Sequence, residues 1–390
     1  MPGFELIGSR ELHEVQKVFE SGAIMSRFGF DGRRNGCFMV QKFEEEFARQ
    51  NQSNHALAVS SGTAALRVAL ASLNIGYGDE VITQCFTFVA TAEAIIECGA
   101  TPVIANIDAT LNIDPTELEL LITPKTKAVI LVHMLGSPGY IKDVRDICAR
   151  RGIFLIEDTA WGCGGSLQET KLGNWGDIGT YSFDFAKTIT TGEGGMLVFK
   201  DQVHWENAKA WHDHGHENNP HVPRWEDTRK SSGFNFRMME LQGALGIAQL
   251  SRLEGIIRDQ RKIHDEIWES IQDLDGLEGR EFPEGSAATC DGLIFFCPSQ
   301  RVARNCRSQL LKAGISTKIL PEAMSWHFAG LWEHMPSLKS HAGKSVRESL
   351  QPSERLLARA VCLPITLTDG AKHAKEIRKA IRLAFNERVS

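Results

Sequence analysis

The sequence predicts an α/β protein with a mostly parallel central sheet and a smaller C-terminal α/β domain. Short apolar runs alternate with helical patterns across residues 55–200, and this alternation is typical of βαβ units in a parallel sheet. The chain of 390 residues has room for a large domain and a smaller second one. Polar motifs follow several of the apolar runs, which is where ligands bind in such sheets.

The strands and helices of the large domain are expected in a regular order. Apolar runs predict strands at residues 55–60, 80–84, 102–107, 128–133 and 153–157. Helical patterns lie between them at residues 63–73, 89–98, 115–121 and 141–151. Because the carboxyl ends of parallel strands share one edge, we expect Ser60-Ser61-Gly62-Thr63, residues 84–88 and Asp158 to lie together there.

The chain changes character after residue 200. Residues 207–232 are rich in His, Asn, Pro and Trp without a clear period, so we expect a long loop. Residues 238–270 carry one long helical pattern. We expect it to lead from a large domain of residues 1–250, which includes an N-terminal segment, into a small domain of residues 251–390.

Composition and charge restrict the class of protein. A net charge of −6 and a pI of about 6.1 argue against binding to nucleic acid or to a membrane surface. The N-terminus lacks a signal-peptide pattern, and no apolar run approaches the length of a membrane span. The nine cysteines are scattered without a C-x-x-C pair, which favours free thiols in a reducing cytoplasm. The basic pair Arg33-Arg34 is expected on the solvated surface.

Lys187 and Asp158 are the candidate catalytic residues. Lys187 lies between the apolar run Tyr181-Ser182-Phe183 and a turn rich in Gly and Thr, so its amine is expected to project from a loop at a strand end. A partly desolvated amine is nucleophilic towards a carbonyl. Asp158 ends an apolar run and suits the task of facing the ring nitrogen of a pyridine cofactor. Together the two residues indicate a pyridoxal-phosphate enzyme, although an acid at a strand end also serves as a helix cap or a metal ligand.

Two further motifs could contact that cofactor. Ser60-Ser61-Gly62-Thr63 follows a strand and opens a helix, where backbone N–H groups bind phosphate; a simple helix N-cap is the alternative. Phe88, after the next strand, could stack on a ring or belong to the core. Neither a P-loop nor the dinucleotide pattern G-x-G-x-x-G is present, which argues against a nicotinamide oxidoreductase.

The run His212-Asp213-His214-Gly215-His216 has a composition that metal sites share. Alternate spacing in a loop is not a common zinc pattern, and no cysteine is near it. We therefore expect no metal here, and interpret the run as a polar or substrate-contacting loop.

The order of these motifs resembles the DegT/StrS family of pyridoxal-phosphate-dependent sugar aminotransferases, which have the type I, aspartate-aminotransferase-like fold. The resemblance covers nearly the whole chain. It is carried by the following segments: Phe43-Glu44-Glu45-Glu46-Phe47, Ser61-Gly62-Thr63-Ala64-Ala65, Gly78-Asp79-Glu80-Val81, Phe86-Thr87-Phe88-Val89, Glu157-Asp158, residues 173–183 and 187–195, Gly233-Phe234-Asn235-Phe236-Arg237 and Leu363-Pro364-Ile365.

The resemblance implies a role for each matching residue. Lys187 would attach the cofactor and later carry a proton, and Asp158 would pair with the pyridine nitrogen. Binding of the remaining cofactor groups is implied for these residues: Gly62, Thr63 and Ser182 at the phosphate, and Phe88 on the ring. Asn235 would reach the cofactor phosphate of a partner subunit, which implies a homodimer with shared active sites.

The chain departs from the family at Trp161. The family has His or Gln at this position, in contact with the oxygen on the cofactor ring. An indole N–H donates one hydrogen bond and accepts none, so Trp161 would contact the cofactor differently or shape the substrate pocket.

A lysine at position 187, where some members have histidine and act as dehydratases, favours transamination with L-glutamate as amino donor. The loop with His214 and His216, together with Trp326-His327, resembles transaminases that make 8-amino-3,8-dideoxy-manno-octulosonate, a sugar of lipopolysaccharide. The expected acceptor is therefore 8-dehydro-3-deoxy-manno-octulosonate. A nucleotide-linked 3- or 4-keto-6-deoxy sugar is the alternative, and a non-catalytic regulatory protein that binds pyridoxal phosphate is a further one.

Overall fold

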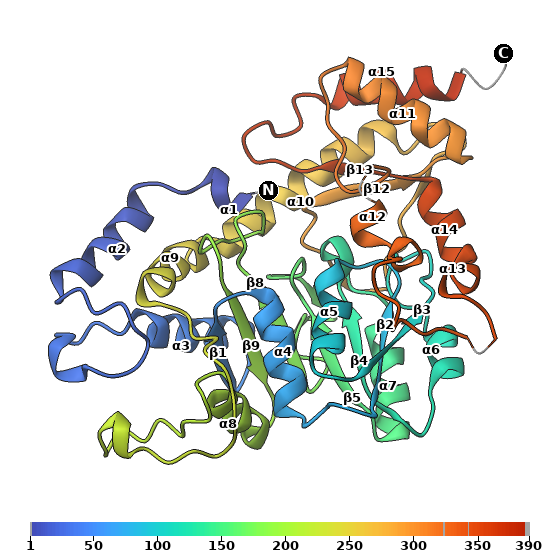
Figure 1. Cartoon of the computed structure of the whole chain (residues 1–390). Helices are drawn as coiled ribbons and strands as arrows, with labels where there is room; N and C mark the ends of the chain where they lie inside the picture. The colour runs from blue at the N-terminus through green and yellow to red at the C-terminus, as the bar shows by residue number, and fades with distance from the viewer. Residues whose placement is uncertain (1, 323, 342, 387–390) are drawn as a thin grey trace.

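The computed structural model describes residues 2–322, 324–341 and 343–386. Its centre is a sheet with seven strands in the order β1-β9-β8-β5-β4-β2-β3 (Figure 1). The strands are β1 (His55–Val59), β2 (Glu80–Gln84), β3 (Thr101–Ala105), β4 (Thr126–Val132), β5 (Phe154–Asp158), β8 (Ile178–Ser182) and β9 (Gly195–Phe199). All neighbours from β3 to β8 pair in parallel, and only β9 runs against its neighbours β8 and β1. The predicted α/β class with a mostly parallel sheet is confirmed.

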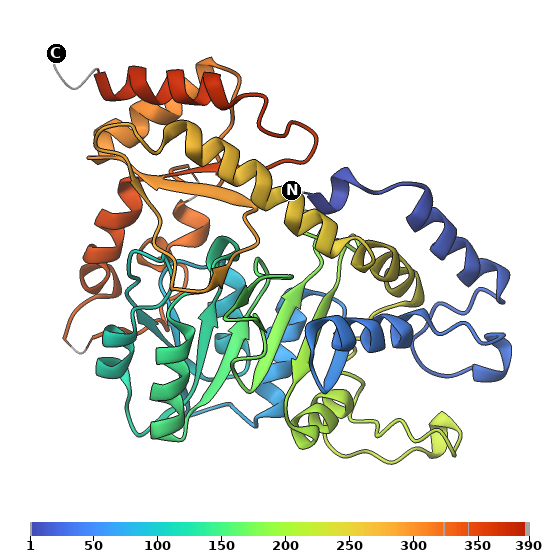
Figure 2. The ribbon, with the colours of Figure 1, turned by 180° about the vertical axis from the view of Figure 1, so that it is seen from behind.

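Helices cover both faces of this sheet, as Figures 1 and 2 show from opposite sides. Along β4, Ala128 and Ile130 belong to the apolar cluster on one face, whereas Val129 and Leu131 belong to the cluster on the other. Strands buried on both faces are expected to be continuously apolar, as residues 128–132 of β4 are. The helices on the first face are α4 (Gly62–Ser72), α5 (Val89–Glu97) and α8 (Gln202–Trp211), and those on the second include α6 (Pro115–Leu121) and α7 (Ile141–Arg151).

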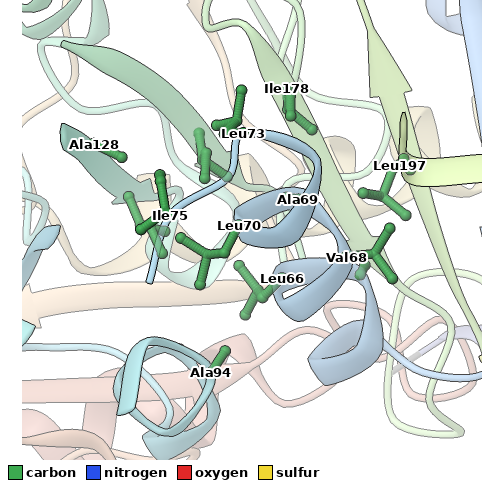
Figure 3. Close-up of a cluster of buried hydrophobic side chains, with 14 of the residues drawn as sticks. Leu66, Val68, Ala69, Leu70, Leu73, Ile75, Ala94, Ala128, Ile178 and Leu197 are labelled. Atoms are coloured by element: carbon green, nitrogen blue, oxygen red, sulfur yellow. The ribbon is translucent and has the colours of Figure 1, made fainter. Parts of the chain in front are cut away.

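Helix α4 is fixed against the sheet by its apolar side chains. Leu66, Val68 and Leu70 are buried within the cluster that Figure 3 shows, which also contains Ile178 of β8 and Leu197 of β9. Each side chain of this kind contributes roughly 1.5–3 kcal/mol when fully buried. The N-terminus of α4 therefore has a fixed position beside the ends of β1 and β8.

The C-terminal part of the chain forms a second, smaller sheet in the order β10-β12-β13, with antiparallel pairs. It lies beyond the carboxyl edge of the central sheet in Figure 1, covered by long helices. Its elements are α10 (Leu253–Ile271), β10 (Glu278–Gly279), β12 (Gly292–Phe296), α11 (Gln300–Lys312), β13 (Ala360–Pro364) and α15 (Ala374–Asn386). A separate cluster of buried side chains, which includes Phe295 and Ile381, forms its core.

Between α11 and β13 the chain returns to the large sheet. This return segment contains α12 (Met324–His327), η4 (Ala329–Leu331), α13 (Val346–Ser349) and α14 (Gln351–Ala358). Phe86 forms an isolated β-bridge with Phe328, and the Thr87 amide donates a hydrogen bond to the carbonyl of His327 at 2.9 Å. These contacts hold His327 against the end of β2.

Two segments of the large domain project to the same side of the molecule in both views (Figures 1 and 2). One is N-terminal, with α1 (Pro2–Glu5), α2 (Ser9–Glu20), η1 (Asp31–Arg33) and α3 (Met39–Asn51), and the other contains η3 (Arg224–Glu226) before α9 (Glu240–Leu250). The remaining short elements are η2 (Met134–Gly136) and a small sheet of β6 (Ser166–Leu167), β7 (Thr170–Lys171) and β11 (Ser286–Ala287).

Three expectations need correction. The helical pattern of residues 238–270 forms two helices, α9 and α10, because the chain bends at Ser251-Arg252, where the Arg252 side chain donates to the carbonyl of Leu6 at 2.8 Å. The loop predicted from residue 207 begins later, because helix α8 continues to Trp211. Asp201 caps the start of this helix by accepting a hydrogen bond from the Val203 amide at 2.7 Å.

The third correction concerns Arg34, which was expected on the surface. Its guanidinium is buried and donates to the Glu240 carboxylate at 3.1 Å, while the second oxygen of Glu240 accepts from the Val40 amide at 3.0 Å. This ion pair joins the segment before α3 to the start of α9.

Within the described residues, no helix combines the length and apolar character needed to cross a membrane. All nine cysteines are free thiols, and six of them are buried. Burial raises the pKa of several of these thiols, for instance that of Cys163 to about 12, so these thiols stay protonated.

Candidate active site

A cavity of about 380 Å³ lies at the carboxyl edge of the central sheet. The β1–α4 turn, the β2–α5 turn, the end of β5, the β8–β9 loop and the return segment of the small domain all line it. Larger hollows lie elsewhere on the surface, but neither Lys187 nor Asp158 lines them. The lining residues of the edge cavity include Gly62, Thr63, Phe88, Thr91, Asp158, Trp161, Ser182, Lys187, Lys318 and His327.

Lys187 projects into this cavity from the loop between β8 and β9. Its backbone amide donates to the carbonyl of Asp184 at 3.0 Å, and its own carbonyl accepts from the amide of Gly3 at 3.2 Å. The side chain keeps some exposed surface, which faces the cavity, but protein atoms surround the amine. Burial lowers the pKa of Lys187 to about 8, although the nearby carboxylates of Asp158 and Asp291 oppose the shift. A larger fraction of the amine is therefore neutral at physiological pH than for an exposed lysine.

Asp158 lies at the last position of β5 and is buried. One carboxylate oxygen accepts from the hydroxyl of Thr91 at 3.0 Å, and the other accepts from the Ala160 amide at 3.1 Å. Thr91 is in turn 2.8 Å from the hydroxyl of Thr87. Burial raises the pKa of Asp158, while these two hydrogen bonds and the charge of Lys187 lower it. Each carboxylate oxygen retains capacity for another hydrogen bond from inside the cavity.

The N-terminus of α4 forms the next wall of the cavity. Ser61 caps the helix, since its hydroxyl accepts from the Ala64 amide at 3.0 Å. A Cβ atom on Gly62 would lie 2.7 Å from Cβ of Ser182, so only glycine permits this close approach of α4 to β8. The first N–H groups of a helix have no partner inside the helix, and here they open beside the Ser182 hydroxyl. The N-cap alternative is thus observed, and the anion cradle at the same turn stays a prediction.

Three aromatic residues lie at the mouth of the cavity. Phe88 and Trp326 are stacked, with ring centroids 6.2 Å apart and planes inclined by 16°. Phe88 also lies 5.7 Å from the ring of His327. Phe88 is 40% exposed and lines the cavity, whereas Trp326 is 61% exposed and lies outside the lining.

Trp161 is in contact with two amines. The Nζ atom of Lys187 lies 3.6 Å from the centroid of the indole ring, and the Nζ atom of Lys318 lies 4.7 Å from the same centroid. Lys318 was not among the predicted site residues. It belongs to the small domain, and no motif in its sequence neighbourhood indicates that it faces the cavity. Thr91 was missed for a similar reason, because a threonine inside an apolar helix gives no signal of its own.

Besides Trp326, three of the predicted residues do not line this chain's cavity. Asn235 is exposed, and its backbone pairs with that of Asp213. His214 is exposed as well, whereas His216 is buried and bonded through Nδ1 to Asp227 at 3.0 Å. His214, His216 and Asn235 all lie in the segment between α8 and α9.

Asp213 organises this loop. It is fully buried and forms ion pairs with Arg224, at 2.5 Å, and with Arg237. Among the residues with described positions, no group of three or more His, Cys, Asp or Glu side chains could hold a metal ion.

The cavity fits the pyridine cofactor that the sequence indicates. Its chemistry offers a buried acid with spare acceptor capacity, an amine with a lowered pKa, a helix N-terminus with an adjoining hydroxyl, and open aromatic faces. These groups match a ring nitrogen, an aldehyde, a phosphate and a planar ring in turn. The close approach that Gly62 permits is what an anion needs to reach the backbone of α4.

Comparison with known sequences gives a family. A profile of the DegT/DnrJ/EryC1/StrS aminotransferase family matches residues 7–382. The spore coat polysaccharide biosynthesis protein SpsC of Bacillus subtilis is 38% identical over 283 residues, which are 70% of this chain and 69% of that protein. GDP-perosamine synthase of Vibrio cholerae is 39% identical over 225 residues, or 57% of this chain and 60% of that enzyme.

Solved structures agree with this result. The aminotransferase TlmJ from Streptoalloteichus hindustanus has a TM-score of 0.84 at 26% identity, and the match covers 100% of this chain and 98% of that one. 3-Amino-5-hydroxybenzoic acid synthase has a TM-score of 0.85 at 26% identity, over 98% of this chain and 97% of that one. The predicted fold of the pyridoxal-phosphate-dependent transferases and the predicted cofactor are thereby confirmed.

Proposed function

This chain belongs to the DegT/DnrJ/EryC1/StrS aminotransferase family, and from that premise we propose that it transfers the amino group of L-glutamate to a keto- or aldehydo-sugar. The acceptor that we favour is 8-dehydro-3-deoxy-manno-octulosonate. That the protein is a pyridoxal-phosphate-dependent sugar aminotransferase follows from the family and its relatives. The observation that carries the proposal is the presence of Lys187 and Asp158 in one cavity.

We assign the site residues as the sequence indicated. Lys187 and Asp158 act in catalysis, and the cofactor is held by these side chains together with Gly62, Thr63, Phe88, Trp161 and Ser182. When bound, pyridoxal phosphate supplies a carbonyl that carries the amine and a ring that accepts electrons. Asp158 holds the proton of the ring nitrogen, and Thr91 orients the carboxylate for that task. The amine of Lys187, neutral in part because it is desolvated, takes a proton from the substrate carbon and returns it.

The acceptor is proposed from the mouth of the cavity. Trp326 and His327, which matched the octulosonate transaminases in sequence, lie beside Phe88. Their open aromatic faces suit the apolar face of a sugar chain. The proposed product, an amino sugar, would become part of lipopolysaccharide. We also propose that the reaction takes place in the cytoplasm.

A nucleotide-linked keto-sugar is the second candidate acceptor, and the names of the relatives favour it. GDP-perosamine synthase carries a nucleotide sugar in its name. The dTDP-4-dehydro-2,3,6-trideoxy-D-glucose 4-aminotransferase of Saccharopolyspora spinosa, 34% identical over 282 residues, does so as well. Single-turnover assays with both sugar types, each added to the aminated cofactor form, distinguish the two acceptors.

An absorption spectrum tests the first half of the reaction. Purified protein with pyridoxal phosphate is expected to show the visible band of a lysine-bound cofactor, and L-glutamate is expected to replace it by the band of the pyridoxamine form. A band that does not respond to L-glutamate or to other amino acids would support the non-catalytic regulatory alternative. Lys125→Ala, which alters an exposed lysine, is the matched control for Lys187→Ala in this assay and should give the spectra of the unaltered protein.

We also propose a homodimer with shared sites, to which Asn235, His214 and His216 contribute from the partner subunit. None of the three lines this chain's own cavity, which supports this assignment. Mixing an inactive Lys187→Ala variant with an Asn235→Ala variant should restore part of the activity, because one mixed dimer contains one intact site. If subunit exchange is demonstrated and no activity returns, the shared site is wrong. The division at residue 250 stays a prediction for limited proteolysis.

A further inference from the structure

Lys318 is the strongest feature of the cavity that the proposed mechanism does not use. Of the lining residues that the structure describes, only Lys187 and Lys318 are lysines, and no arginine is among them. An amino-acid donor carries at least one carboxylate, and binding such a group in a partly buried cavity requires a compensating cation. Lys187 reacts with the substrate, so a second cation is needed to hold the anion.

The small domain holds Lys318 in a fixed position. Its backbone amide donates to the carbonyl of Cys362 on β13 at 2.8 Å. Its ammonium donates to a carboxylate oxygen of Asp291 at 2.7 Å and to the carbonyl of Asp291 at 3.2 Å. The Lys318 side chain is 8% exposed and that of Asp291 is 1% exposed. Lys318 and Asp291 thus form a buried ion pair.

An ammonium group has three N–H donors, and the described hydrogen bonds of Lys318 use two of them. The remaining surface of the side chain belongs to the cavity wall. A purely structural ion pair at this depth would be costly to desolvate and replaceable by apolar packing. A third donor, on a residue that lines the cavity, gives this pair a different use.

The amines of Lys187 and Lys318 share one neighbour, the indole ring of Trp161. Both amines contact the ring of Trp161, at 3.6 Å for Lys187 and 4.7 Å for Lys318. In an α-amino acid the carboxylate is attached to the same carbon as the reacting amine, so a group held by Lys318 keeps that carbon close to Lys187. The positive charge of Lys318 also contributes to the lowered pKa of Lys187.

We propose that Lys318 binds the carboxylate of the substrates, and so selects a carboxylate-bearing donor, acceptor or both. This inference rests on the proposed aminotransferase function. Asp291 is a positioning residue, because it holds the ammonium and does not itself line the cavity.

Calorimetry with glutarate, an unreactive dicarboxylate, tests binding without catalysis in the cofactor-loaded protein. We expect Lys318→Met to weaken glutarate binding by at least about tenfold, the effect of losing one charge-assisted hydrogen bond, and Lys318→Arg to retain binding. Lys318→Met combined with Asp291→Asn removes both charges, so a buried unpaired acid cannot explain its result. Lys312→Met, at an exposed position in α11, is the control.

Wild-type affinity in the double variant, or no glutarate binding by the unaltered protein, would overturn the proposal. The half-saturating concentrations of the two substrates, compared between Lys318→Met and the unaltered protein, then identify which substrate supplies the carboxylate. A rise for L-glutamate assigns Lys318 to the donor, and a rise only for a carboxylate-bearing keto-sugar assigns it to the acceptor. Glutarate binding that depends on Lys318, in a protein whose visible band ignores L-glutamate, would leave this site standing while the proposed function fails.

Discussion

The amine of Lys187 lies 3.6 Å from the centre of the Trp161 indole ring, at the position where the family has His or Gln. An aromatic face attracts a cation and cannot accept a proton. Trp161 therefore stabilises the charged form of Lys187, while burial favours the neutral form and lowers the pKa to about 8. The reactive amine is held by a contact that weakens when it loses its proton, which leaves it free to react.

Replacing Lys187 by alanine should abolish turnover while leaving non-covalent cofactor binding in place. The phosphate cradle at Gly62 and the acid Asp158 do not depend on the amine. Measured by absorption, Lys187→Ala should lack the visible band yet retain cofactor after gel filtration. An active Lys187→Ala protein would remove the lysine from its role.

Asp158→Asn should lose activity by roughly 100-fold or more, equivalent to about 2.7 kcal/mol. A neutral amide cannot stabilise a protonated ring nitrogen, although it preserves the shape of the side chain. The hydrogen bond from Thr91 can persist in this variant, so its fold should be intact by circular dichroism. Wild-type kcat/KM would contradict the assignment.

Thr91→Val should move the acidic limb of the pH profile upward. The hydroxyl of Thr91 donates to Asp158 at 3.0 Å and lowers the pKa of that acid. Without it, Asp158 binds its proton more tightly, so a higher pH is needed for the same ionised fraction. We expect kcat/KM at neutral pH to fall about tenfold, in line with about 1.5 kcal/mol for such a bond. Thr91→Ser, which keeps the hydroxyl, should restore the profile, and a Val variant with the wild-type profile would exclude this role.

Lys187→Met should change stability in a pH-dependent way in the cofactor-free protein. The pKa of Lys187 is lowered from 10.5 to about 8, so the unfolded chain binds more protons than the folded one between these values. The contribution of Lys187 to the free energy of unfolding therefore rises with pH across that window, by no more than about 3 kcal/mol. Below pH 8 the methionine variant should be more stable than the wild type. That difference should shrink by pH 10, as urea denaturation at both pH values would show; a constant difference would contradict the shift.

Gly62→Ala should weaken cofactor binding. The added methyl group would approach Ser182 to 2.7 Å, so α4 or β8 must shift and the phosphate cradle is distorted. We expect the Kd for pyridoxal phosphate to rise at least about tenfold, since contacts to a charged group are worth roughly 1.5–3 kcal/mol. Gly255→Ala is the matched control, because the nearest atom to its added methyl group is 3.8 Å away. Equal cofactor affinity in both variants would argue against the cradle.

The sequence by itself determined the α/β class and most of the strands, because a buried strand must be apolar and a helix must follow it to cover the sheet. It also placed Gly62, Phe88, Asp158 and Lys187 near one edge. That inference holds because each residue lies within a few positions of a strand end, and parallel strands bring those ends together.

Only the tertiary structure decided which distant residues join them. Lys318 and His327 come from the small domain, and they reach the cavity because the return segment packs on the end of β2. The break between α9 and α10 and the burial of Arg34 depend likewise on partners far along the chain, Leu6 and Glu240. Contacts of this kind leave no periodic pattern, since they arise from the packing of elements whose relative positions local sequence does not encode.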